Sequence, residues 1–170
     1  MKSIYIVLSY TGSYPSKLIK LFTGSKYAHI SISFDRDLNK MYSFGRKYLH
    51  FPVPGAFVEE SLSSGLFIKD KVLLKVVEVK ITKEQYESLK RYISLVQGSK
   101  PFYDYKGAVG TYLGKNMFKE NGYTCASFIA KSLSSSLDIH IDYWSIIPEE
   151  IEEIIDGNII FEGLAKNYLK

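Results

Sequence analysis

The sequence predicts a mixed α+β fold that forms one domain over residues 1–170. A chain of 170 residues with 46% apolar side chains can bury one substantial hydrophobic core but not two comfortable ones. Segments of alternating apolar and polar residues dominate the first half, and segments with helix-capping signals dominate the second half. No internal repeat, linker or low-complexity tract interrupts this order, so we expect a single α+β domain.

Two elements are expected ahead of the first histidine. Residues 3–9, within "MKSIYIVLSYTG", are a mostly apolar run that predicts a strand and lacks the length and the cleavage site of a signal peptide. The next stretch, "SYPSKLIKLFTGSK", predicts a short helix with Pro15 near its start and Gly24 as its stop. A strand and a short helix should therefore lead into His29.

A β-hairpin is predicted for "YAHISISFDRDLNKMYSFGR", because apolar and polar residues alternate on both sides of a polar turn. Its first strand has one apolar face and one face of small polar residues with a histidine: Ile30, Ile32 and Phe34 against His29, Ser31 and Ser33. Small side chains beside His29 would let a helix pack closely on that face.

The middle of the chain predicts a long loop and one confident strand. Residues 47–66 are rich in proline and glycine, which favours a loop that contains one candidate strand at "AFVEE". Loops of this length are often functional. The run "KVLLKVVEVKI" then alternates and is rich in β-branched residues, so it predicts a strand.

Helices are predicted for most of the second half. Thr82 and Gln85 form a capping box that opens a helix to about Gln97. A shorter helix is expected within "PFYDYKGAVGTYLG", and another begins near Cys125 in "NGYTCASFIAKSL". In "IIPEEIEEIIDGN", Pro148 occupies a first helical position and predicts the last helix.

Composition excludes several classes of protein. The chain has 22 basic and 18 acidic side chains, and a dispersed net charge of +4 does not indicate a nucleic-acid partner. No stretch approaches the roughly eighteen consecutive apolar residues of a membrane span. We therefore expect a cytoplasmic protein, in which the single cysteine stays a thiol. One cysteine and three scattered histidines lack zinc-ligand spacing, so no metal or other cofactor is expected.

Cys125 allows two interpretations. Phe128, Ile129 and Leu133 lie three, four and eight residues after it, so the thiol shares the core-facing stripe of its helix and can be a small buried apolar residue. The first turn of a helix, however, offers unpaired N–H groups and a positive dipole end, which stabilise a thiolate and an oxyanion. Packing and nucleophilic catalysis both remain open for this residue.

His29 is the best candidate for a base that activates the thiol, while His50 and His140 have weaker cases. A catalytic histidine usually needs a third group that fixes its tautomer, placed on an adjacent strand. Ser43 is the expected partner from strand alternation, and Glu59 or Glu60 from the loop could take the role instead. All three remain candidates.

Four stretches resemble the circularly permuted NlpC/P60 cysteine peptidases, the papain-like amidase group called YiiX or YaeF-like. They are "SKLIKLFTGSKYAHISI", "KPFYDYKGAVG", "YTCASFIAKSL" and "IIPEEI". They are similar to that group's turn before the catalytic histidine, its Tyr-Asp-Tyr helix, its nucleophile helix and its C-terminal turn. The order of histidine before cysteine is specific to the permuted branch.

The resemblance implies a papain-like α+β fold in which an antiparallel sheet presents His29 to the Cys125 helix. It implies Cys125 as nucleophile and His29 as general base, without a cofactor. The family's third polar residue is frequently a glutamate at the end of the second hairpin strand. That strand here reads "MYSFGR", so Ser43 is taken in its place; Tyr10 is a candidate donor to the oxyanion.

The expected function is that of a cysteine hydrolase or amidase that cleaves an amide or ester bond through a thioester. The substrate would be a small molecule, a lipid amide or a peptide. The related lecithin retinol acyltransferase-like enzymes use the same residue order for acyl transfer between lipids, which makes such an activity the first alternative. The second alternative is a binding module that keeps the fold without turnover.

Overall fold

The computed structural model describes residues 1–12, 24–47 and 54–168, so most of the helix expected over residues 13–26 lies outside the described residues. The elements of the described part are, in chain order, β1 (Lys2–Tyr10), β2 (His29–Ser33), β3 (Met41–Arg46), β4 (Gly55–Glu60), β5 (Leu73–Ile81), α2 (Lys83–Gly98), β6 (Phe102–Tyr103), α3 (Tyr105–Tyr112), β7 (Gly122–Tyr123), α4 (Cys125–Ser134), α5 (Pro148–Ile154), β8 (Asn158–Leu164) and the 3₁₀ turn η1 (Ala165–Asn167). The expected mixed α+β class is confirmed.

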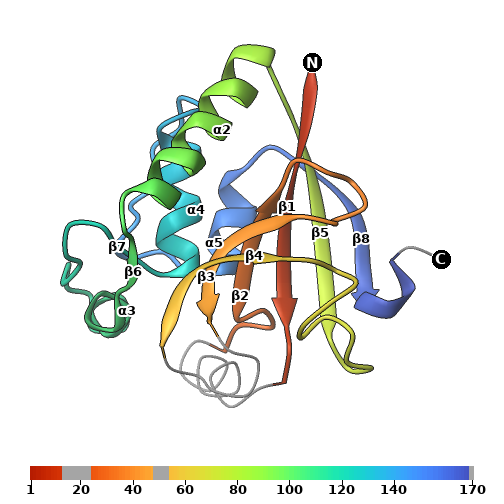
Figure 1. Ribbon diagram of the computed structural model, residues 1–170, viewed down its shortest axis with the longest axis horizontal. Coiled ribbons are helices and arrows are strands. Elements are labelled where there is room, and N and C mark those ends of the chain that lie inside the picture. The colour runs from red at the N-terminus through yellow and green to blue at the C-terminus, as the bar shows by residue number, and fades with distance from the viewer. Residues whose placement is uncertain (13–23, 48–53, 169–170) are drawn as a thin grey trace.

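Six strands form one antiparallel sheet in the order β4-β3-β2-β1-β5-β8 (Figure 1). The hairpin expected from the alternating pattern is present as β2 and β3, and "AFVEE" lies within the edge strand β4. In this register His29 pairs with Ser9 of β1 at the point where β2 begins. The histidine therefore lies at one end of the sheet rather than in its middle.

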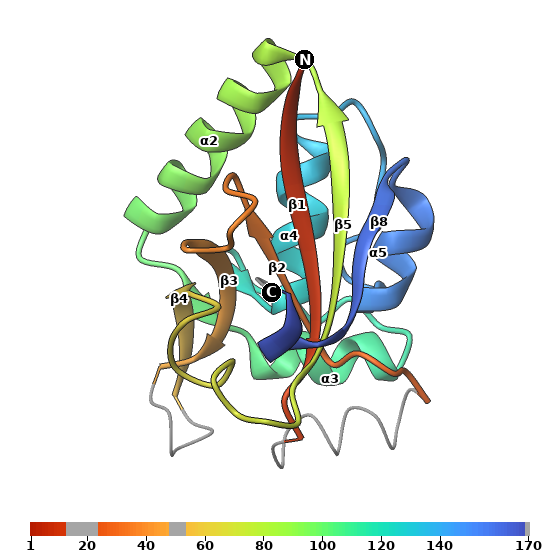
Figure 2. The same cartoon turned by 90° about the vertical axis from the view of Figure 1, so that its right-hand side faces the viewer.

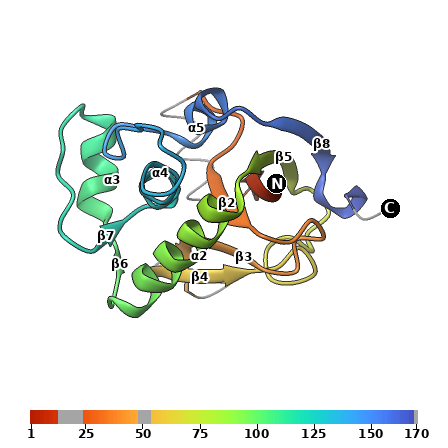
Figure 3. The ribbon, with the colours of Figure 1, turned by 90° about the horizontal axis from the view of Figure 1, so that it is seen from above.

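Helices cover one face of the sheet. In Figure 2, α4 lies behind β1 and β5 and α5 lies behind β8, and α2 runs alongside α4 (Figure 3). α4 is buried almost all round, as expected for a central helix, and its Phe128 ring contacts Phe44 and Phe57 of the sheet at centroid distances of 5.4 and 5.7 Å. The expectation that a helix packs on the serine face of β2 is wrong, because α4 packs with the core that includes Ile30 and Ile32.

The opposite face of the sheet is covered by the segment between β4 and β5. Leu62, Phe67 and Val72 of this segment join a second apolar cluster with Val7 and Val76 of the strands. The serines on this side of the hairpin are fully buried: Ser31, Ser33 and Ser43.

Three details differ from the sequence-based expectation. Helix α3 begins only at Tyr105, because Asp104 caps it by accepting a hydrogen bond from Gly107 N at 2.8 Å. The alternation of His140 with Ile139 and Ile141 favours an exposed strand, but these residues form none. Strand β8 was not predicted, since its three consecutive apolar residues do not alternate and a half-exposed edge strand carries a weak pattern: Ile159, Ile160 and Phe161.

Candidate active site

Cys125 is the first residue of the buried helix α4. Thr124 ends the preceding extended segment and caps the helix: its hydroxyl accepts a hydrogen bond from Ser127 N at 3.1 Å, and its own N–H donates to Ser127 Oγ at 2.8 Å. This capping box fixes the point at which the helix begins. The thiol therefore lies in the first turn, where unpaired backbone N–H groups and the positive end of the dipole gather.

His29 is held by a carboxylate from the edge strand. Its Nε2 atom lies 3.0 Å from both carboxylate oxygens of Glu60. Ser31 donates its hydroxyl hydrogen to Glu60 Oε2 at 2.6 Å, which fixes the carboxylate beside the ring. An ionised carboxylate only accepts hydrogen bonds, so Nε2 carries the hydrogen and Nδ1 is left as the basic nitrogen.

The expected contact between Ser43 and His29 is not formed. Ser43 donates its hydroxyl hydrogen to Ile30 O at 2.6 Å and is fully buried, so it ties β3 to β2 instead. Glu59, the other alternative, forms an ion pair with Lys40 at 2.9 Å. Among the three candidates, Glu60 is the residue that contacts the imidazole.

Small residues between β4 and β2 make room for the Glu60 side chain to reach His29. Gly45 lies on the intervening strand β3, and a Cβ atom there would lie 3.4 Å from His29 Cε1 and 3.7 Å from Glu60 Oε1. Ser31, the hydrogen-bond donor to Glu60, is the smallest polar residue that can fill the remaining space and also donate. The sequence "MYSFGR" thus contributes space, while the carboxylate comes from the next strand.

The charge on His29 depends on its neighbours. Burial of the ring favours the neutral form, but the Glu60 carboxylate and the Cys125 side chain outweigh it and raise the pKa of His29 well above its usual 6.5. Burial also disfavours the Glu60 carboxylate, yet His29, Ser31 and Arg46 together lower the pKa of that group. Glu60 therefore stabilises the imidazolium form of His29 relative to the neutral ring.

The Cys125 side chain lies close enough to His29 to contribute to the raised pKa of the ring. Because Nε2 is engaged by Glu60, Nδ1 is the ring nitrogen that can take the thiol proton. The structure thus places Cys125, His29 and Glu60 at one site. Such an arrangement could serve as a nucleophile, a base and an orienting acid.

Cys125 and His29 open into one cavity of about 460 Å³. Most of its wall is apolar or aromatic, and the residues come from β3, β6, α3 and the segment before α5: Phe44, Tyr103, Ala108, Val109, Tyr112, Ile146 and Ile147. This size and lining are typical of a site for a small ligand with an apolar part. A thiol at the wall of such a cavity is accessible to a bound substrate even though it is 9% exposed.

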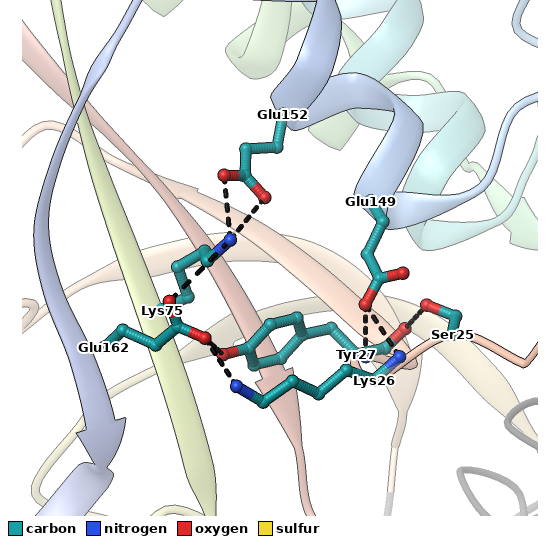
Figure 4. Close-up of polar contacts among 7 residues, drawn as sticks. All are labelled: Ser25, Lys26, Tyr27, Lys75, Glu149, Glu152 and Glu162. Atoms are coloured by element: carbon teal, nitrogen blue, oxygen red, sulfur yellow. Dashed lines mark hydrogen bonds and ion pairs between the residues drawn. The ribbon is translucent and has the colours of Figure 1, made fainter.

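A polar cluster fixes the chain just before His29 (Figure 4). Glu149 of α5 accepts hydrogen bonds from the backbone N–H groups of Lys26 and Tyr27, at 2.7 and 3.0 Å. The Tyr27 hydroxyl donates to Glu162 Oε1 of β8 at 2.8 Å. These contacts anchor the entry into β2, so α5 helps to set the position of the histidine two residues later.

Three further residues of the cavity were not anticipated from the sequence. Burial first, and then the Cys125 charge, raise the pKa of Tyr103 and of Tyr112, so both hydroxyls stay protonated beside the thiol. Arg46 brings a positive charge to the same cavity. Tyr10, the expected oxyanion donor, packs against the helix-side core and is not among the residues that line the cavity. Tyr103, Tyr112 and Arg46 are identified by their position beside Cys125 in the folded chain, which the sequence does not show.

Of the other two histidines, His140 has no part in this geometry. The His140 side chain is 90% exposed and lies 3.3 Å from Asp142. His50 lies outside the described residues. Among the described residues, His29 is therefore the histidine that lies beside Cys125.

The chain matches no protein-family model, no curated protein and no solved structure. Within residues 1–12, 24–47 and 54–168, no group of three or more His, Cys, Asp or Glu side chains is placed to hold a metal ion. In the same ranges we find no helix with the length and apolar character needed to cross a membrane. Function is therefore inferred from the site itself.

Removing the cap of α4 should disturb the thiol as well as the fold. We expect Thr124→Ala to lower the free energy of unfolding by about 1 kcal/mol and to slow alkylation of Cys125 by iodoacetamide. Thr82→Ala removes the same kind of capping box from α2 and is the matched control. Urea unfolding should show similar losses for both variants, whereas an unchanged alkylation rate in Thr124→Ala would argue against a role of the helix start in reactivity.

Removing the Glu60 charge should lower the pKa of His29. In Glu60→Gln no adjacent carboxylate outweighs the burial of the ring. The neutral imidazole is then favoured and the pKa of His29 falls. NMR titration of the three histidines gives the pKa directly, with His29→Ala to assign the signal. Glu59→Gln is the matched control and should leave the titration unchanged; equal shifts in the two variants would contradict the assignment of Glu60.

The same pair makes stability depend on pH. The raised pKa of His29 contributes stability that is fully present below 6.5, the usual value, and is lost as the pH rises through the folded-state pKa. The lowered pKa of Glu60 contributes stability that is present above 4.5 and is lost as the pH falls through its folded-state pKa. The difference in unfolding free energy between the native chain and Glu60→Gln should therefore be largest between these two values.

Proposed function

We propose that the protein is a cysteine hydrolase that cleaves an amide or ester bond through a thioester on Cys125. One observation carries the proposal: a thiol at the start of a buried helix lies beside a histidine that a partly buried carboxylate holds, at the wall of a largely apolar cavity. Each part has a distinct chemical role in acyl transfer, and packing alone requires none of them.

The reaction would begin with transfer of the thiol proton to His29 Nδ1. The thiolate attacks the substrate carbonyl and forms the C–S bond, while the carbonyl π electrons become an oxyanion that the backbone N–H of Cys125 stabilises. The oxyanion then collapses, and the leaving amine or alcohol takes the proton from the imidazolium. Water deprotonated by His29 attacks the thioester and releases the acid and the free thiol.

Glu60 would stabilise the imidazolium that forms in both steps and hold the ring in the productive tautomer. Tyr103 and Tyr112 supply protonated hydroxyls at the same cavity and are candidates for further hydrogen bonds to substrate. A binding module without turnover was motivated by the absence of a carboxylate from "MYSFGR". Since Glu60 supplies that carboxylate, the enzyme is the better supported of the two.

We assign the domain to the circularly permuted papain-like class as part of this proposal. The supporting features are the order of His29 before Cys125, the start of the central helix at the cysteine, and a histidine presented by an antiparallel sheet. The partner acid Glu60 comes from the strand beyond the hairpin, whereas the NlpC/P60 group frequently carries it at the end of the second hairpin strand.

The cavity lining favours a substrate with an apolar acyl group over a short polar peptide. The same lining supports a second candidate, acyl transfer to an acceptor other than water, because only the final nucleophile differs. Competition between water and an added alcohol or amine for the thioester would separate the two activities.

Ester hydrolysis tests the proposal directly. The native chain should hydrolyse p-nitrophenyl octanoate with a kcat/KM at least about tenfold above that for the acetate, because each buried methylene adds binding energy. Prior alkylation with iodoacetamide should abolish both activities. No turnover of esters or amides above the alkylated protein would overturn the proposed function.

A further inference from the structure

Helix α3 turns an apolar stripe toward solvent. Four large apolar or aromatic residues of this helix and its C-cap are exposed: Tyr105 (44%), Val109 (54%), Tyr112 (46%) and Leu113 (62%). The first three are separated by four and three residues, which places them on one side of the helix. Phe102 and Met117 flank the stripe and are also exposed. Six of the eleven exposed large hydrophobic side chains in the described part of the chain therefore lie within residues 102–117. Scattered apolar residues need no explanation, whereas such a cluster indicates an interaction surface.

The side of α3 that faces the protein is built from small residues. A Cβ atom on Gly107 would lie 2.5 Å from the Phe118 ring, and one on Gly110 would lie 2.4 Å from Lys115 O. Thr111 donates its hydroxyl hydrogen to Trp144 O at 2.8 Å on the same side. α3 is thus fixed with its glycines inward and its apolar stripe outward, the reverse of an ordinary surface helix.

Exposed charges around the stripe are mostly positive. Four exposed lysines lie within residues 100–120: Lys100, Lys106, Lys115 and Lys119. Glu120 is the exposed acidic residue of this range, and Asp104 is buried as the cap of α3. An exposed apolar helix face with lysines beside it is typical of proteins that bind at the surface of an anionic bilayer.

The stripe is continuous with the catalytic cavity. Tyr105, Val109 and Tyr112 belong to both, because α3 forms one wall of the cavity that contains Cys125. α3 also lies at the periphery of the molecule, on the opposite side from β8 (Figure 3). A bilayer that covered α3 would therefore lie directly at the mouth of the cavity.

We propose that the outer face of α3, with its flanking lysines, docks the protein on an anionic lipid surface. The apolar stripe would enter the region between head groups and acyl chains, and the lysines would contact the lipid phosphates and carboxylates. Tyrosines suit this depth because the ring is apolar and the hydroxyl can face water. The bound protein would take up substrate from the surface rather than from solution.

Vesicle sedimentation tests the apolar part of the surface. The native chain should bind vesicles of phosphatidylcholine with phosphatidylserine, and Leu113→Asp should bind at least about tenfold more weakly, because a buried leucine is worth that much in a binding constant. Leu95→Asp on α2 is the matched control, since Leu95 is 72% exposed and lies outside this surface. Circular dichroism verifies the fold of both variants. Equal binding by the two variants would overturn the proposal.

The same assay tests the charges. Binding should weaken with salt and with pure phosphatidylcholine vesicles, and the double variant Lys115→Gln/Lys119→Gln should bind roughly tenfold more weakly. Lys69→Gln/Lys71→Gln changes two exposed lysines elsewhere and is its control. Absence of binding to the vesicles that contain phosphatidylserine would overturn the proposal. Self-association lost in Leu113→Asp would also overturn it, by assigning the surface to a second copy.

Vesicle binding does not depend on the thiol. Cys125→Ala should bind vesicles as the native chain does, so loss of the proposed chemistry and loss of the proposed docking are separate outcomes. Binding without ester hydrolysis would overturn the enzyme and leave the surface. Ester hydrolysis without vesicle binding would overturn the docking surface and leave the proposed enzyme.

Discussion

Replacing Cys125 with alanine is expected to lower kcat/KM for ester hydrolysis by at least about a thousandfold, because the variant has no atom that can form the acyl intermediate. Cys125→Ser should be nearly as inactive, since His29 is placed to pair with a thiol and a serine hydroxyl loses its proton far less readily. Because Cys125 is the single cysteine of the chain, the result also identifies the reactive residue without ambiguity.

Stability measurements separate chemistry from folding in these variants. Serine and alanine are both close to cysteine in volume, so neither opens a large cavity at this 9% exposed position. Urea unfolding of the two variants should therefore give midpoints near that of the native chain. Residual hydrolysis within tenfold of the native rate, in a folded Cys125→Ala protein, would show that another residue performs the reaction.

Replacing His29 with alanine is expected to slow alkylation of Cys125 by iodoacetamide at neutral pH by at least about tenfold. The thiolate reacts and the thiol does not, and in the proposed mechanism His29 accepts the thiol proton and balances the resulting charge. Hydrolysis should fall further, by about a hundredfold or more, because the base acts in both halves of the reaction. The alkylation rate should recover as the pH is raised and the thiol ionises without help.

His140→Ala is the matched control for this variant. It removes an exposed histidine that pairs with Asp142, so both alkylation and hydrolysis should remain at the native rate. Equal alkylation rates in His29→Ala and the native chain at neutral pH would contradict the pairing of thiol and imidazole. Recovery of reactivity at high pH in His29→Ala would confirm that the thiol itself remains accessible.

Much of the fold follows from local patterns. The capping box at Thr82, the alternation of the hairpin and the proline of α5 each act through a few neighbouring residues, and the structure contains all three elements. Strand β8 depends on pairing with β5 far along the chain, and its own apolar residues do not alternate. The prediction that α4 packs on the serine face of the hairpin is wrong. The small serines suggested a close helix contact, but α4 packs against the apolar face.

In the candidate site, too, features set by neighbouring residues can be predicted and features set by distant residues cannot. The position of Cys125 at a helix start can be predicted, since Thr124 and Ser127 are adjacent to it in sequence. The contact of Glu60, rather than Ser43, with His29 cannot be predicted from the sequence. It depends on how far a side chain on the edge strand reaches across Gly45. Strand alternation gives the face of each residue but not the reach of its side chain.

The cavity and the outer face of α3 were also out of reach of the sequence. "DYKGAVGTYLG" places apolar residues at helical spacing, which ordinarily predicts a core-facing stripe. Gly107 and Gly110 reverse this orientation, since their side of the helix can approach Phe118 and the backbone where a larger residue cannot. Only the packed structure shows that α3 presents its stripe to solvent and to the cavity.

The mass of the Cys125 peptide during ester turnover tests the central claim most directly. Native protein mixed with p-nitrophenyl octanoate, quenched in acid and digested with trypsin, should give the peptide of residues 120–131 with one octanoyl group that hydroxylamine removes, as expected of a thioester. The modified fraction should rise within the first turnover and decay when substrate is exhausted, and it should be strongly reduced in His29→Ala. Turnover of the ester without any acyl group on this peptide, or equal acylation in His29→Ala, would contradict the account.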